Sequence, residues 1–323
     1  MRLLLLMLLL PFAANAHPGV GIVSDRRGII YYTDLQHVWK IEGGKRSIAV
    51  RDVHTHELYL DTAGNLYGEN ERYQGGDRFT HYLWVLRPSG RLDTLKGPDV
   101  AFVNDDYSLA RDAAGNEYFR RHHFRKTGPV PLYRRRPDGS EALFAEGDYR
   151  DVKWLHPQPD GSLLFVRANA VYRISTEGRV LLLADSLAGA KPDFPFASGP
   201  QLWGAWQDAG GQVYVAVFSD GAVKRVAPGG GLAVVHRSAP RWTPTYGAFD
   251  PEGRLWVLET SDKNEIRVVP AGGEPEATGT AAAVSEQRFA RGALMAGLLL
   301  VPALLVGYWL WRRGKDREHR SNG

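Results

Sequence analysis

The feature that most constrains this chain is a short turn that recurs six times, each time just before an apolar and aromatic stretch. Its fullest form runs from Asp61 to Gly68, where Asp-Thr-Ala-Gly is followed by Asn-Leu-Tyr-Gly. Aspartate suits such a turn because its carboxylate caps nearby amides, and glycine suits it because it tolerates positive φ. The anchoring residues are Asp25, Asp61, Asp112, Asp160, Asp208 and Asp250.

These anchors are 36 to 51 residues apart, which leaves room for several strands in each unit. In the second unit we expect strands over residues 53–60, 65–69, 82–87 and 91–95, because apolar and aromatic residues alternate with Gly, Pro and Asp punctuation. A weak last strand is expected near residues 276–280. Units of this length with four strands each predict an all-β chain, namely a six-bladed β-propeller over residues 17–270.

Composition and charge narrow the functional classes. The chain has 323 residues, no cysteine and a formal net charge of +4, so a disulfide or thiolate metal site is excluded. Removing Arg2 and the tail after Trp311 leaves 34 basic and 34 acidic residues. The body is thus neutral, which gives no reason to expect nucleic-acid binding. We expect a monomer.

Both ends predict export and membrane anchoring. Residues 1–16 have a basic start, a leucine run and an Ala-Asn-Ala end, as in a secretory signal peptide. Residues 292–311 are apolar or small, long enough for one transmembrane helix, and are followed by a basic tail at 312–323. Residues 271–291 form the linker. The propeller would then lie on the periplasmic or extracellular side of the inner membrane; a cleaved sorting signal is the alternative reading of the C-terminal segment.

The one chemically rich inner strand carries His54, His56 and Glu57. The two histidines are two residues apart and would share a face, where a divalent ion such as zinc or copper would find two ligands. His17 would join them if cleavage occurs after Ala16. Glu57 faces the other way in a regular strand and is a candidate acid or base. Channel water held by the histidines is the alternative to a metal.

Other residues lead their inner strands toward the same mouth of the channel. They are candidates for catalysis (Asp105) and for ligand binding (Tyr107, Lys153, His156, Trp203 and Tyr246). Long, polar b–c connections over residues 70–80 and 122–130 are expected on one rim, where binding surfaces usually lie.

The repeated units resemble the NHL-repeat and gluconolactonase/regucalcin-like six-bladed propellers. The resemblance covers residues 19–270 and is carried by stretches such as Gly247-Ala-Phe-Asp250-Pro-Glu-Gly253-Arg-Leu-Trp256. It implies the propeller fold and, in the lactonases, a divalent metal such as calcium held by carboxylate and Asn ligands. The ligand sets of these families do not match here residue by residue.

Two functions therefore remain open from the sequence. The first is a membrane-tethered module that binds a small ligand or a protein partner at its channel mouth. The second is a metal-dependent enzyme of lactonase or lyase type that uses His54 and His56 as ligands and Glu57 or Asp105 in acid–base chemistry.

Overall fold

The structure is a computed structural model that describes residues 19, 21–75, 78–99, 108–121, 127–152, 154–189, 202–227 and 230–272. All of them belong to one compact unit, Met1–Thr278. The second unit, Gly279–Gly323, lies outside the described residues, as do the predicted signal peptide, span and tail. Within the described ranges no helix is long and apolar enough to cross a membrane.

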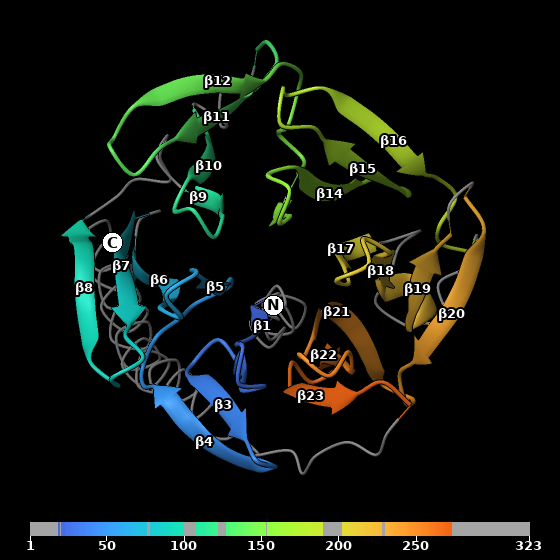
Figure 1. Ribbon diagram of the computed structural model, residues 1–323, viewed down its shortest axis with the longest axis horizontal. Helices are drawn as coiled ribbons and strands as arrows, with labels where there is room; N and C mark the ends of the chain where they lie inside the picture. Colours follow the sequence, from blue (N-terminus) through green and yellow to red (C-terminus); the bar gives the residue numbers. More distant parts are fainter. Residues whose placement is uncertain are drawn as a thin grey trace, which may run out of the picture. The chain divides into compact units, whose positions relative to one another are not determined.

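Six antiparallel sheets are arranged around a central channel, so the predicted six-bladed β-propeller is confirmed (Figure 1). Blade 1 has strands β1 (Ile22–Ser24), β2 (Ile30–Thr33), β3 (Val38–Glu42) and β4 (Lys45–Val50). Blade 2 has β5 (Tyr59–Leu60), β6 (Leu66–Gly75), β7 (Arg78–Leu86) and β8 (Leu92–Asp99). Blade 3 has β9 (Ser108–Arg111), β10 (Glu117–Arg120), β11 (Leu132–Arg135) and β12 (Glu141–Ala145).

The other three blades continue the same order from the channel outward. Blade 4 has β13 (His156–Pro157), β14 (Leu163–Arg167), β15 (Ala170–Ile174) and β16 (Val180–Ala184). Blade 5 has β17 (Leu202–Gln207), β18 (Val213–Val217), β19 (Ala222–Val226) and β20 (Leu232–Arg237). Blade 6 has β21 (Trp242–Phe249), β22 (Leu255–Ser261) and β23 (Ile266–Pro270); the weak strand predicted near residues 276–280 lies outside the described residues. A 3₁₀ turn spans Phe218–Asp220.

The recurring turn holds each blade through its aspartate. In blade 3 one carboxylate oxygen of Asp112 accepts hydrogen bonds from the amides of Ala114 (3.0 Å) and Asn116 (2.9 Å). The other oxygen accepts one from the hydroxyl of Tyr118 at 3.1 Å, six residues on. Asp61, Asp208 and Asp250 hold Tyr67, Tyr214 and Trp256 in the same way. In these four blades the turn is thereby tied to the aromatic ring of the strand that follows it.

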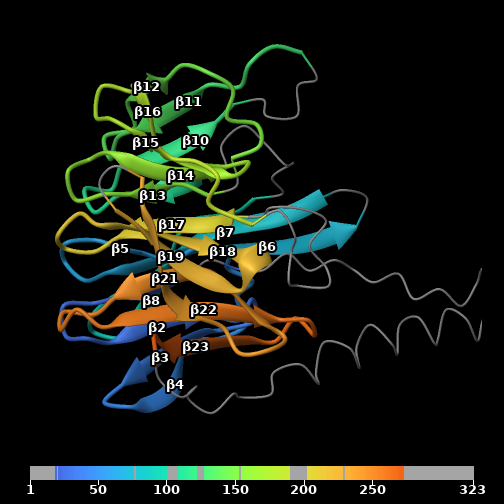
Figure 2. The ribbon, with the colours of Figure 1, turned by 90° about the vertical axis from the view of Figure 1, so that its right-hand side faces the viewer.

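Two predictions about blade 2 are wrong. The first strand covers only Tyr59–Leu60, not residues 53–60, because side-chain hydrogen bonds replace ladder bonds before it. The polar connection predicted for residues 70–80 is instead part of the long β6–β7 hairpin, which extends beyond the other blades in Figure 2. Both arms contain aromatic residues, and β7 also contains Thr80 and Val85, which favours continued pairing over a loop.

Apolar clusters join most neighbouring blades. One cluster joins blades 5, 6 and 1, and others join blades 1 and 2, 3 and 4, and 4 and 5. Between blades 2 and 3, the described apolar contact is that of Tyr59 with the blade 3–4 cluster.

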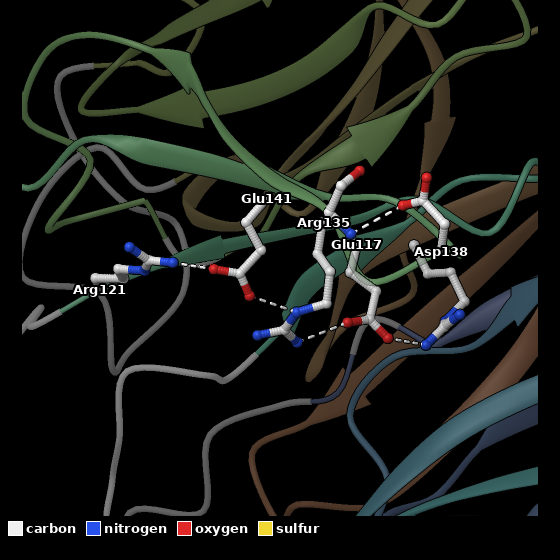
Figure 3. A network of polar contacts seen from close by, with 7 residues as sticks. Glu117, Arg121, Arg135, Asp138 and Glu141 are labelled. Carbon is white, nitrogen blue, oxygen red and sulfur yellow. Dashed lines mark hydrogen bonds and ion pairs between the residues drawn. The ribbon is translucent and has the colours of Figure 1, made fainter.

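A ladder of alternating charges lies on blade 3 facing this seam. Arg135 donates to Glu141 at 2.7 Å and to Glu117 at 3.0 Å, while Arg121 pairs with Glu141 and Arg111 pairs with Glu117 (Figure 3). The guanidinium of Arg111 also lies 5.2 Å from the ring centroid of Tyr67 in blade 2. The ion pairs of this ladder lie within blade 3, and the contact of Arg111 with Tyr67 connects the ladder to blade 2.

Candidate functional site

A cavity of about 790 Å³ occupies the channel and reaches the mouth formed by the recurring turns. Every blade contributes its innermost residues to the wall. The wall includes Glu57, Tyr59, Arg111, Trp154, His156, Trp206 and Tyr246. A site of this size, concave and mostly apolar with a few convergent polar groups, is typical for a small organic molecule.

His156 and Tyr246 face each other across this cavity from blades 4 and 6. The Tyr246 hydroxyl is hydrogen-bonded to Nδ1 of His156 and lies 3.3 Å from the carbonyl oxygen of Ala205. Burial lowers the pKa of His156 to about 4, so its imidazole is neutral at neutral pH. Burial, and then the charge of Glu57, raise the pKa of Tyr246 well above its usual value, so the phenol keeps its proton. The pair is therefore uncharged and can exchange a proton with a bound molecule.

Local irregularities in two strands place Tyr246. The pairing of β21 with β22 shifts register between Pro244 and Tyr246, because proline has no amide hydrogen to donate. Gly204 in β17 leaves room for the ring, since a methyl group added there would lie 2.0 Å from Cδ2 of Tyr246. A larger residue at position 204 would displace the phenol from His156.

Glu57 is a buried carboxylate of the cavity wall, with 7% of its surface exposed. Tyr59 lies in the same wall, and burial followed by the charge of Glu57 raises its pKa well above the usual value. Glu57 does not point away from its neighbour as a regular strand predicts. His56 packs 6.2 Å from Trp154 of blade 4, ring centroid to centroid, so the consecutive side chains of His56 and Glu57 both face the channel.

The backbone before β5 is held by side chains of blade 2. The Thr55 hydroxyl donates to the carbonyl of Glu69 at 2.6 Å, and the His54 amide donates to Oδ1 of Asn70 at 2.7 Å. The indole of Trp84 donates to the Thr55 hydroxyl at 3.2 Å. These bonds take the place of the regular strand pairing that the alternating sequence pattern predicts. They explain why the consecutive side chains of His56 and Glu57 share a face.

His54 and His56 do not line this cavity, and both lie beside β6, although His56 packs against Trp154 of the cavity wall. Their rings meet edge to face with centroids 4.7 Å apart. Nδ1 of His56 lies 3.9 Å from Glu71, and Nδ1 of His81 lies 3.5 Å from the same carboxyl group. Burial raises the pKa of Glu71 and lowers that of His81, so each is shifted toward its neutral form.

The remaining predicted residues are placed as follows. Trp203 packs against Phe218 with ring centroids 5.4 Å apart, so its ring belongs to the core of blade 5. The other candidates, His17, Asp105, Tyr107 and Lys153, lie outside the described residues. The structure thus brings Glu57, His156 and Tyr246 together in one cavity, and it adds Tyr59, Trp154 and Trp206, which the sequence did not single out.

The described residues do not fit a metal centre. Among them, no three His, Asp or Glu side chains converge closely enough to hold one ion. His54 and His56 provide two imidazoles, and Nδ1 of His56 lies 3.9 Å from a carboxylate oxygen of Glu71. The chemistry considered below therefore uses only the protein's own described groups.

No family model matches the chain, and no curated protein matches it. Solved structures do. A gluconolactonase from Xanthomonas campestris is 16% identical, with 78% of this chain and 85% of that chain covered and a TM-score of 0.52. A putative gluconolactonase is 17% identical, with 79% and 89% covered and a TM-score of 0.52. Virginiamycin B lyase from Staphylococcus aureus is 15% identical, with 80% and 87% covered and a TM-score of 0.46.

The fold and the channel thus define a six-bladed β-propeller similar to the gluconolactonase propellers, as the sequence resemblance predicts. At these identities the likeness concerns the fold. The function has to be argued from the site.

Proposed function

We propose that this chain is an enzyme that takes a small organic molecule into the channel cavity and acts on it by general acid–base chemistry. The observation that carries the proposal is the uncharged His156–Tyr246 pair in a cavity to which all six blades contribute. This favours the enzymatic alternative of the sequence over a plain binding module. The gluconolactonase propellers of the same fold add support, since their names state an activity on lactones.

The roles follow from the protonation of the two groups. Tyr246 keeps its proton, so its hydroxyl is an acid or an oxyanion donor for a carbonyl oxygen. His156 is neutral, and in the tautomer in which Nδ1–H donates to the Tyr246 oxygen, its Nε2 is the nitrogen that accepts a proton from water or from a substrate carbon. Lactone hydrolysis needs proton transfer from water, and a lyase reaction needs proton transfer from a substrate carbon.

A panel of lactones and activated esters tests this proposal. The first variant, Tyr246→Phe, removes a hydroxyl that lines the cavity. The control variant, Tyr67→Phe, removes a hydroxyl that lies outside the cavity and is bonded to the turn residue Asp61. We expect Tyr246→Phe to lower kcat by about 100-fold and Tyr67→Phe to leave it unchanged. Saturable binding in the cavity without turnover of any compound would favour the binding module instead.

We keep a divalent metal as a separate proposal that rests on His54 and His56. Metal analysis of the purified protein and of the His54→Ala/His56→Ala variant tests it. Stoichiometric metal that is lost in the variant would mean that residues outside the described ranges complete a site. Metal-free protein with full lactone activity would contradict a metal-dependent reaction.

We also propose that the propeller is exported and anchored in the inner membrane by residues 292–311. The support is the pattern of the sequence, an apolar stretch followed by Arg312 and Arg313. A reporter fused after Gly323 should be active only on the cytoplasmic side. A reporter found outside the membrane, or cut from the chain, would contradict this topology.

A further inference from the structure

We infer that the channel cavity recognises an organic cation, that is, a substrate or ligand with a protonated or quaternary amine next to an apolar body. This inference rests on the proposed function, because both place the bound molecule in the channel cavity. It adds the chemical class of that molecule. The observations are the charge of Glu57, the aromatic rings around it and the neutrality of the imidazole opposite.

The first observation is the sign of the charge inside the cavity. Glu57 is 7% exposed and lines the wall beside Tyr59 and Tyr246. Burial, and then the charge of Glu57, raise the pKa values of both phenols. A cation that enters the cavity therefore meets a carboxylate in surroundings of low dielectric constant, where attraction between opposite charges is strong.

The second observation is the balance of cationic groups among the described wall residues. Arg111 lines the cavity on the side of blades 2 and 3, and its guanidinium is paired with the carboxylate of Glu117. Arg26 is exposed at the turn mouth, where Asp25, Asp112, Asp208 and Asp250 also lie. His156 is neutral at neutral pH because burial lowers its pKa. Carboxylates thus outnumber cations along the described wall, which disfavours anionic ligands.

The third observation is the aromatic wall. Tyr59, Trp154, Trp206, Tyr246 and Phe249 all border the cavity and come from four different blades. Trp206 and Tyr246 pack with ring centroids 5.5 Å apart, and Trp154 packs against the same apolar cluster. Aromatic faces attract cations, Trp most strongly, and they also accommodate an apolar body. Carboxylate and aromatic groups in one enclosed site are the combination that selects alkylammonium groups.

Three probes of similar size and different charge test the inference: benzyltrimethylammonium, phenylacetamide and phenylacetate. Binding is measured by the fluorescence of Trp154 and Trp206 and by isothermal titration with the full chain in detergent. The variants are Glu57→Gln, which removes the buried charge at constant shape, and Glu252→Gln, which removes one exposed charge beside the turn mouth. The second variant is the matched control for net charge.

We expect benzyltrimethylammonium to bind at least about tenfold more tightly than phenylacetamide, and phenylacetate to bind most weakly. Glu57→Gln should abolish this preference, and Glu252→Gln should preserve it. Equal binding of the three probes to the native protein would overturn the inference even if Glu57→Gln does not fold. Tighter binding of the neutral probe would overturn the inference but would keep the cavity as the binding site. If no probe binds while lactone activity is intact, the inference is overturned as well.

Discussion

Replacing His156 by glutamine should change how the stability of the protein depends on pH. In the folded state His156 lies in the channel wall, and burial lowers its pKa from about 6.5 to about 4. The unfolded chain therefore binds a proton between these pH values that the folded chain does not bind. Stability from this group is fully present above pH 6.5 and is lost as the pH falls toward 4.

The size of the effect follows from the two pKa values. At pH 5 the unfolded imidazole is almost fully protonated, and the folded one is about one-tenth protonated. Linkage then gives a loss of about 2 kcal/mol in the free energy of unfolding between pH 8 and pH 5. Glutamine does not titrate, so His156→Gln should lack this part of the pH dependence while keeping a polar partner for Tyr246.

Urea unfolding followed by tryptophan fluorescence at pH 8, 7, 6 and 5 measures the difference between the two proteins. The carboxylates titrate in both, so their contribution cancels in the comparison. The native protein should lose about 2 kcal/mol more than the variant on going from pH 8 to pH 5. Parallel curves for the two proteins would show that His156 is not buried in neutral form, and the acid–base argument would fail with it.

Three further predictions concern the scaffold. Tyr118→Phe removes a hydroxyl bonded to its turn aspartate and should lower the free energy of unfolding by about 1 kcal/mol in urea titrations. Gly204→Ala would push a methyl group into the ring of Tyr246 and should cost about 2 kcal/mol and most lactone turnover. Gly231→Ala should change neither, because its methyl group would make only an ordinary contact with Cβ of Ala227 at 3.7 Å. Glu117→Gln should cost about 1 kcal/mol at low salt and less at 1 M salt, because Glu117 pairs with Arg111 and Arg135 within blade 3; a salt-independent loss would contradict that account.

The fold was predictable because one physical device is repeated in the sequence. Four of the six turn aspartates cap the amides two and four residues on, and Asp61 and Asp112 show this with nearly identical distances. A second regularity of the sequence marks the same turns. In five of the six units a Tyr or Trp stands six residues after the aspartate, and in four of them its polar atom bonds the second carboxylate oxygen.

The site was only partly predictable. The sequence indicated Glu57, His156 and Tyr246 as channel residues, and the structure places all three in the same cavity. The sequence did not indicate at which end of the channel the cavity opens. The cavity reaches the mouth formed by the recurring turns, not the mouth where the inner strands begin. Neither Tyr59 nor Trp154 carries a motif, since their role depends on which blades face each other across the channel.

Alternation failed where the backbone is irregular. Side-chain hydrogen bonds from Thr55 and His54 to blade 2 override the strand pattern, so Glu57 turns inward together with His56. Such bonds involve residues 14 to 16 positions away, and no local pattern reveals them. The same holds for Gly204, whose importance follows from contact with Tyr246 of the next blade.

The central claim is that chemistry takes place at His156 and Tyr246, in the cavity behind the turn mouth. The most direct test compares the kcat of His156→Gln with that of His54→Ala/His56→Ala on the best substrate of the lactone panel. A loss of about 100-fold in the first and less than threefold in the second is the predicted result. Full activity of His156→Gln, with the activity abolished in the double variant, would place the reaction at the other end of the channel.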